Sequence, residues 1–122
     1  MSVDLYLVNG YGVCLNDLSF KSKEEVDLFL KEVSEEKETH YIDYFDYISD
    51  CLDSDLEIAY IETTSKDYLY IPAVLPLKKN EKWLFTKEEI AEKIHSIIHP
   101  LIKNSKEEVL ELLDHVFDWE VC

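Results

Sequence analysis

The sequence predicts an α+β protein in which an antiparallel sheet of two hairpins packs against about four helices. Two observations predict this class. Stretches of alternating apolar residues are typical of half-buried strands, and three Ser/Thr-x-x-Glu motifs each precede an apolar stripe of helical period. The predicted order is ββααββαα, with a further β-strand at the C-terminus. Because 122 residues fit one domain and 47% of them are hydrophobic, we expect residues 1–122 to form one domain with a substantial core.

The first hairpin is predicted at the N-terminus. Apolar side chains alternate with others over residues 3–7, and a second apolar run covers residues 11–15. Asn9-Gly10 lies between the two runs, and this dipeptide favours a type I′ turn, whose two central positions need positive φ. A helix is then predicted from the capping motif at Ser22, with an apolar stripe that ends near Val33.

The next predicted helix spans about residues 40–52 and has two unlike sides. One side is apolar and consists of Tyr41, Tyr44, Phe45, Ile48 and Leu52. The other side is acidic and consists of Asp43, Asp46, Asp50 and Asp53. Because residues 38–65 contain eight acids and no Lys or Arg, this row of carboxylates has no counter-charge nearby in the sequence.

The second half of the chain repeats the pattern of strands followed by helices. Strands are predicted at residues 56–62 and 68–71 around a turn at 63–66. Pro72 and Pro76 indicate that the second strand either ends there or lies at an edge. Capping motifs at Thr86 and Ser105 start two more helices. Pro100 is expected to end the first of these near Ile98. The last apolar positions, Phe117, Trp119 and Val121, alternate as in a closing strand.

Charge is the strongest signal in the composition. The chain has 27 acids and 12 bases, its formal net charge is −15, and all of the bases are lysine. A protein with this field, and without the arginine fork that grips phosphate, should be repelled by nucleic acid and by anionic membranes. The only basic cluster consists of Lys78, Lys79 and Lys82. The natural partner of such a chain is a basic protein surface.

Two further features predict a cytoplasmic protein. No apolar run reaches the length of about 20 residues that spans a bilayer, and the N-terminus lacks the pattern of a signal peptide. The three cysteines are odd in number and share no motif spacing, so they indicate no disulfide framework.

The acidic helix and the residues after it form the predicted partner-binding surface. A helix rises about 1.5 Å per residue, so Asp43, Asp46 and Asp50 are spaced by roughly 4.5 and 6 Å along the axis. This is near the spacing of phosphates along a nucleic-acid strand, about 3.4 Å in axial rise and longer along the backbone. A tyrosine at the edge of the row could stack on an arginine of the partner. The predicted binding residues are Asp43, Asp46, Tyr47, Asp50, Asp53, Asp55 and Glu57.

Motifs for catalysis are weak or missing, so we expect a non-enzymatic protein without a cofactor. His95 and His99 have the spacing of metal ligands on a helix, but zinc needs three or four ligands. Asp50, Asp53 and Asp55 partly match a calcium loop, but the glycine of its sharp turn is missing.

No motif matches a family residue by residue. In general character the chain resembles two groups of small, acidic, cytosolic α+β proteins. One group is phage-encoded inhibitors of host defence nucleases, of the anti-CRISPR or anti-restriction type, some of which imitate nucleic acid. The other is immunity proteins and antitoxins that neutralise a nuclease toxin. The first resemblance implies an inhibitor that binds a nucleic-acid-handling protein, and the second implies immunity to a toxin. Two further hypotheses are a metal-dependent enzyme that uses His95, His99 and nearby acids, and a homodimer paired through an edge strand at Tyr68–Ile71.

Overall fold

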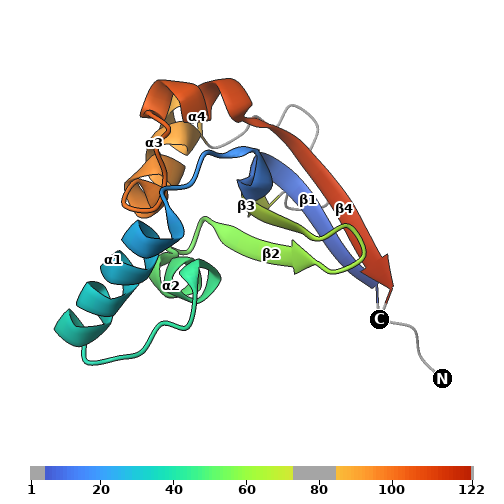
Figure 1. The fold of residues 1–122 in the computed structure, drawn as a ribbon. Coiled ribbons are helices and arrows are strands. Elements are labelled where there is room, and N and C mark those ends of the chain that lie inside the picture. The colour runs from blue at the N-terminus through green and yellow to red at the C-terminus, as the bar shows by residue number, and fades with distance from the viewer. Residues whose placement is uncertain (1–4, 73–84, 122) are drawn as a thin grey trace.

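The computed structural model describes residues 5–72 and 85–121, and the side chains of residues 7–72 and 85–119. The predicted lysine cluster at Lys78, Lys79 and Lys82 lies outside these ranges. The described residues form an α+β fold with four α-helices and a four-stranded antiparallel sheet of order β2-β3-β1-β4. In Figure 1 the helices gather on one side, and β1 and β4 extend away from them together towards the chain termini.

The helices and strands follow the predicted α+β order, with one long strand in place of the first hairpin. The strands are β1 (Leu5–Cys14), β2 (Glu57–Ile61), β3 (Lys66–Pro72) and β4 (Asp114–Val121). The helices are α1 (Lys23–Glu36), α2 (Tyr44–Cys51), α3 (Lys87–Ile98) and α4 (Lys106–Leu112), and a short 3-10 helix spans Leu15–Asp17. The second hairpin, the closing strand and the end of α3 at Ile98 are confirmed.

The predicted turn at Asn9-Gly10 is wrong, because β1 runs straight through this dipeptide. Neither Gly10 nor Gly12 has positive φ, so the freedom of glycine is not used for a turn. The glycines instead permit the close approach of β3. A Cβ atom on Gly10 would lie 2.2 Å from the carbonyl oxygen of Ile71, and one on Gly12 would lie 2.2 Å from that of Leu69.

The long first strand changes the position of β3 in the sheet. β1 pairs with β4 on one side and with β3 on the other, so β3 lies inside the sheet, between β1 and β2. The predicted edge strand at Tyr68–Ile71 is therefore wrong, and dimerisation through this strand is wrong with it. Pro72 is the last residue of β3, where its missing N–H ends the ladder and does not interrupt it.

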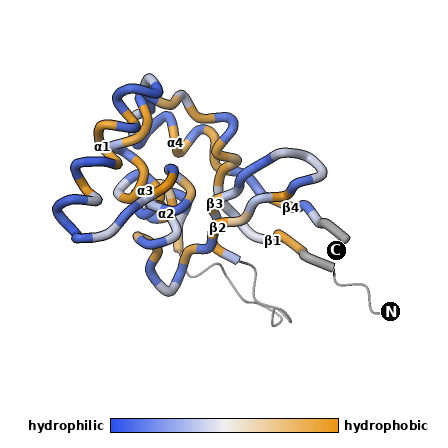
Figure 2. Tube along the Cα trace, turned by 60° about the horizontal axis from the view of Figure 1, so that its bottom comes forward, coloured by the Kyte–Doolittle hydropathy of each residue, from blue (hydrophilic) through white to orange (hydrophobic). Residues whose placement is uncertain are grey.

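The sheet has apolar residues on both faces. The larger core lies between one face and the helices, and its fully buried members include Leu69 of β3, Ile48 of α2 and Ile94 of α3. Along each helix in Figure 2, hydrophobic and hydrophilic residues alternate, as expected where one side meets the sheet. The opposite face carries a smaller cluster of Val8, Ala59, Ile61, Tyr68, Tyr70 and Val116.

The smaller cluster is enclosed because the sheet is strongly coiled. The two edge strands, β2 and β4, contact each other. The side chains of Thr64 and Tyr68 both donate hydrogen bonds to Asp118 of β4, at 3.1 and 2.8 Å. The glycines of β1 lie where the backbones of this coiled sheet approach each other, which is a common position for glycine within strands.

Each predicted capping motif begins a helix. Ser22, Thr86 and Ser105 accept hydrogen bonds from the backbone N–H three residues later. At Thr86 and Ser105 the glutamate also accepts from the N-cap N–H, which completes the reciprocal box. No helix among the described residues is both long enough and apolar enough to cross a membrane.

Candidate functional site

The acidic helix α2 begins at Tyr44, later than the predicted start near residue 40. Asp43 is its N-cap, with extended backbone, and its Oδ1 accepts a hydrogen bond from the Asp46 N–H at 2.9 Å. Asp46 in turn accepts from the Ile42 N–H at 3.3 Å. The N–H of Tyr41 bonds to the hydroxyl of Ser34 in α1, which holds this residue outside the helix. The periodicity could not show where the cap would form.

Tyr47 and Ile48 fix α2 to the rest of the molecule. Ile48 is fully buried, and Tyr47 is 8% exposed. The ring of Tyr47 lies against Phe29 of α1 and against Tyr41, with centroid distances of 5.1 and 5.4 Å. The prediction that Tyr47 contacts a partner is therefore wrong, because packing against α1 takes the ring into the core. The Lys37 amine lies 5.7 Å from the centre of this ring.

The three aspartates of α2 form the acidic row, which we define as Asp43, Asp46 and Asp50. All three are exposed, and no lysine within the described ranges forms an ion pair with any of them. Asp50 accepts a hydrogen bond from the Tyr41 hydroxyl at 2.5 Å, and this bond raises the pKa of Tyr41 to about 12. The row is thus held by backbone N–H groups and a phenol, none of which cancels its charge.

Asp53 and Asp55 differ from the row because one lysine holds both. The amine of Lys93 in α3 lies 3.2 Å from a carboxylate oxygen of each. The backbone N–H of Asp55 and the lysine together lower the pKa of Asp53. Two of the three aspartates in the calcium hypothesis are therefore paired with an ammonium group, and the third, Asp50, is hydrogen-bonded to Tyr41. Lys93 lies far along the chain, so the local sequence gave no signal for this pairing.

Glu57 is exposed and lies at the start of β2, where it accepts a hydrogen bond from the Tyr70 hydroxyl at 3.1 Å. It belongs to the sheet and not to the acidic helix. Of the seven predicted binding residues, the structure therefore brings together Asp43, Asp46 and Asp50 on one helix.

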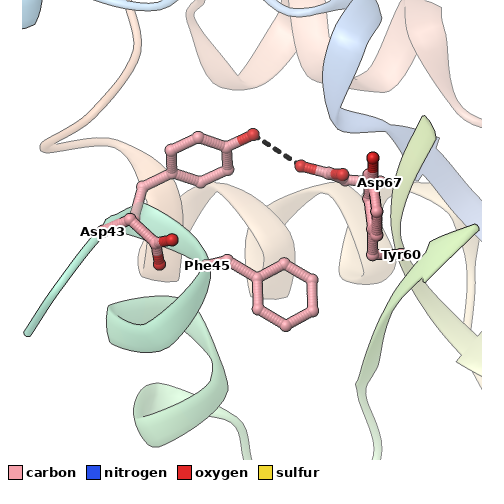
Figure 3. Close-up of a pocket in the computed structure, with 5 residues that line it drawn as sticks. Asp43, Phe45, Tyr60 and Asp67 are labelled. Carbon is pink, nitrogen blue, oxygen red and sulfur yellow. Dashed lines mark hydrogen bonds between the residues drawn. The ribbon is translucent and has the colours of Figure 1, made fainter. Parts of the chain in front are cut away.

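A pocket of about 380 Å³ opens between the start of α2 and the β2–β3 hairpin (Figure 3). It is lined by Asp43, Tyr44, Phe45, Tyr60 and Asp67. The Tyr44 hydroxyl donates a 2.5 Å hydrogen bond to Asp67, and burial together with this bond raises the pKa of Tyr44. Tyr60 and Asp67 were not predicted as site residues, because only the folded hairpin brings them to α2.

The two helical histidines do not form part of a larger ligand cluster. The rings of His95 and His99 lie 5.7 Å apart between centroids. Nε2 of His95 lies 3.2 Å from the Asn104 carbonyl oxygen, to which it donates. In the part of the chain that the structure describes, no group of three or more His, Cys, Asp or Glu residues is placed to hold a metal ion.

A separate apolar patch lies where β1 and β4 extend beyond the helices. Leu7 pairs directly with Trp119 across the two strands, and Phe117 lies two residues earlier in β4. These side chains are 43%, 52% and 57% exposed, respectively. They belong to neither buried cluster, so the molecule has an apolar surface distinct from its acidic one.

Comparisons with protein-family models, with curated proteins and with solved structures give no match.

Proposed function

We propose that the chain is a non-enzymatic inhibitor, which binds the basic surface of a nucleic-acid-handling protein and keeps nucleic acid from it. One observation carries the proposal. The acidic row on α2 is exposed and has no lysine partner among the described residues, in a chain of net charge −15 without arginine. Exposed helices usually mix charges of both signs, because opposite charges three or four residues apart stabilise them.

The neighbourhood of the row strengthens the negative field. Residues 23–57, which include α1 and α2, contain 13 acids and three lysines. All of these acids except Asp55 are exposed. A concentrated field of this kind attracts a positively charged partner over a distance and accelerates association, more so at low salt.

The row is also held in a fixed geometry. Asp43 at the N-cap and Asp46 and Asp50 within α2 are spaced by three and four residues, so they lie towards one side of the helix. Ile48 anchors the opposite side in the core, and Tyr47, at the edge of the row, packs against Phe29 of α1. A fixed row loses less conformational entropy on binding than mobile side chains do. Its axial spacing of roughly 4.5 to 6 Å suits lysine and arginine groups that otherwise hold successive phosphates.

A displacement assay tests the proposal once a partner is identified. Proteins captured from a lysate of the source cells on the immobilised chain, after nuclease treatment, supply the partner. The partner is then loaded with a fluorescent oligonucleotide, and the chain is added. We expect the chain to release the oligonucleotide at about equal molar ratio. Immunity to a toxin uses the same chemistry, and a captured toxin nuclease would favour that interpretation.

The deciding variant replaces Asp43, Asp46 and Asp50 by asparagine, which keeps the N-cap of α2. We expect association with the partner to slow by about tenfold or more at low salt, because steering depends on these charges. The matched control replaces Glu92, Glu107 and Glu111 by glutamine and removes the same charge from α3 and α4. Equal rates for the two variants, or a failure of the chain to release the oligonucleotide, would contradict the proposal.

A further inference from the structure

The pocket beside α2 contains a buried carboxylate without a positive partner. Asp67 is 6% exposed, and one of its oxygens accepts the hydrogen bond from Tyr44. Within residues 7–72 and 85–119, no base forms an ion pair with this carboxylate, and its other oxygen accepts no hydrogen bond. An opposite charge nearby stabilises a buried carboxylate, so Asp67 favours a cationic group in the pocket.

Aromatic rings form much of the rest of the pocket. Phe45 comes from α2 and Tyr60 from β2, so the two rings approach the pocket from different elements (Figure 3). Tyr60 is 48% exposed, which leaves its ring accessible to a partner. The face of an aromatic ring attracts a cation, and a pocket that joins rings to carboxylates is a common receptor for cationic groups.

A second carboxylate belongs to both the pocket and the acidic row. Asp43 lines the pocket, and its Oδ1 accepts from the Asp46 N–H. A side chain that enters the pocket would therefore meet one carboxylate at the exposed end of α2 and another in the interior. This arrangement joins the pocket to the surface that the inhibitor would use.

We propose that this pocket receives an arginine side chain of the basic partner. Its guanidinium group would stack against Tyr60 and Phe45 and donate hydrogen bonds to Asp67 and Asp43. Arginine suits the pocket better than lysine does, because a guanidinium group is planar, stacks on rings, and donates several hydrogen bonds in a fixed fork. The inference rests on the proposed function for the source of the arginine, and the pocket would be its specific anchor.

Short peptides test the pocket without the partner. The probe is an N-acetylated, C-amidated Gly-Arg-Gly peptide, with matched peptides that contain citrulline or lysine in place of arginine. Each is titrated into the ¹⁵N-labelled chain of residues 1–122 and followed by NMR. We expect the arginine peptide to shift the amide signals of Tyr44, Phe45, Tyr60 and Asp67 in a saturable way. The neutral citrulline peptide should leave them unchanged, and the lysine peptide should bind more weakly.

Two variants locate the binding within the pocket. Asp67→Asn removes the charge but can still accept the hydrogen bond from Tyr44, and we expect it to weaken arginine binding about tenfold. Tyr60→Leu removes the exposed ring, and we expect about a threefold loss. Because Tyr60 is half exposed, this variant remains informative if Asp67→Asn does not fold. Glu111→Gln removes one charge from α4, away from the pocket, and should bind the peptide as the unmodified chain does.

Three results would overturn the inference. These are no shift at the pocket amides, equal binding of the citrulline or lysine peptide, and equal weakening by Glu111→Gln. If the pocket fails while the chain still releases nucleic acid from its partner, the inhibitor proposal stands without an arginine anchor. If the peptide binds as expected but no nucleic acid is released, the inhibitor proposal alone is wrong.

Discussion

The acidic row on α2 and the pair that follows it differ in what holds their carboxylates. Asp43, Asp46 and Asp50 accept hydrogen bonds from backbone N–H groups and a tyrosine hydroxyl. Asp53 and Asp55 share the amine of Lys93. A backbone N–H or a phenol satisfies a carboxylate but leaves its charge for another molecule, whereas a lysine cancels part of it. Only the first group therefore suits a basic partner.

Position along the backbone explains the difference for all of these residues except Asp50, which lies in the last turn of α2 and is held by the Tyr41 hydroxyl. Asp43 and Asp46 lie at the N-terminus of α2, where the helix dipole favours negative charge without any lysine. Asp53 and Asp55 lie between α2 and β2, where Asp55 donates its N–H to Asp53 and α3 supplies the counter-charge. The same residue type thus has a different role in two places only a few residues apart.

The largest effect on stability is expected when the residue that anchors α2, and with it the acidic row, is replaced. Ile48→Ala should lower the free energy of unfolding by about 3 kcal/mol, because the isoleucine is fully buried and its loss leaves a cavity. Ile42→Ala is the matched control, since Ile42 is 80% exposed, and it should change stability by less than about 0.5 kcal/mol. Urea unfolding measures both. Equal losses would mean that α2 is not fixed through its apolar side.

A smaller effect separates the capping role of Asp43 from its charge. Asp43→Ala should cost about 1 kcal/mol of stability, because the N–H of Asp46 loses its acceptor. Asp43→Asn keeps an acceptor and should cost less, although it removes the same charge. Urea unfolding of the two variants provides the comparison. If asparagine is as costly as alanine, then charge at the helix dipole and not the cap dominates.

Much of the fold could be predicted because it depends on local signals. The Ser/Thr-x-x-Glu motifs start helices at Lys23, Lys87 and Lys106 through contacts within a few residues. The end of α3 at Ile98 also depends on a local signal, because Pro100 disfavours continuation of the helix. The prediction of a turn at Asn9-Gly10 was wrong because the structural role of the glycines is not local. They permit the approach of β3, which lies some 60 residues away along the chain.

The candidate site was less predictable for the same reason. Helical period predicted that Asp43, Asp46 and Asp50 lie together, and they lie at the N-cap and along the length of α2. The period could not show that α1 would cover Tyr47, or that Lys93 would reach Asp53 and Asp55. Tyr60 and Asp67 join the pocket only because the β2–β3 hairpin lies beside α2. Contacts between distant segments decide which charges remain free.

The paired group can be converted to resemble the row by removing its lysine. Lys93→Gln should lower the free energy of unfolding by only about 0.5 kcal/mol at neutral pH, because the three side chains are partly exposed. Lys103→Gln is a matched control that breaks no ion pair within the described residues. If Lys93→Gln also strengthens binding to a basic partner, the freed carboxylates have joined the acidic surface.

The effect of Lys93 on stability has a defined dependence on pH. The pKa of Asp53 is lowered, first by the backbone N–H of Asp55 and also by Lys93, so this contribution is present above the ordinary pKa of 3.8. It is lost as the pH falls through the lowered value. Urea unfolding at neutral and acidic pH measures the free energy of unfolding of the unmodified chain and of Lys93→Gln. The difference between the two values should shrink in acid. A difference that grows in acid would contradict the ion pair.

The smallest expected effect concerns Asp50, the last aspartate of the row. Its hydrogen bond raises the pKa of Tyr41 to about 12, from an ordinary value of 10. Because the folded-state pKa is raised, the stability from this bond is complete below pH 10 and is lost as the pH rises through 12. In Asp50→Asn the acceptor is no longer charged, so the pKa of Tyr41 should fall towards 10. The ring ¹³Cζ shift of Tyr41 measures this change, and Asp114→Asn serves as a control elsewhere in the chain. An unchanged Tyr41 pKa would mean that Asp50 does not face the phenol, and the third carboxylate of the row would then point elsewhere.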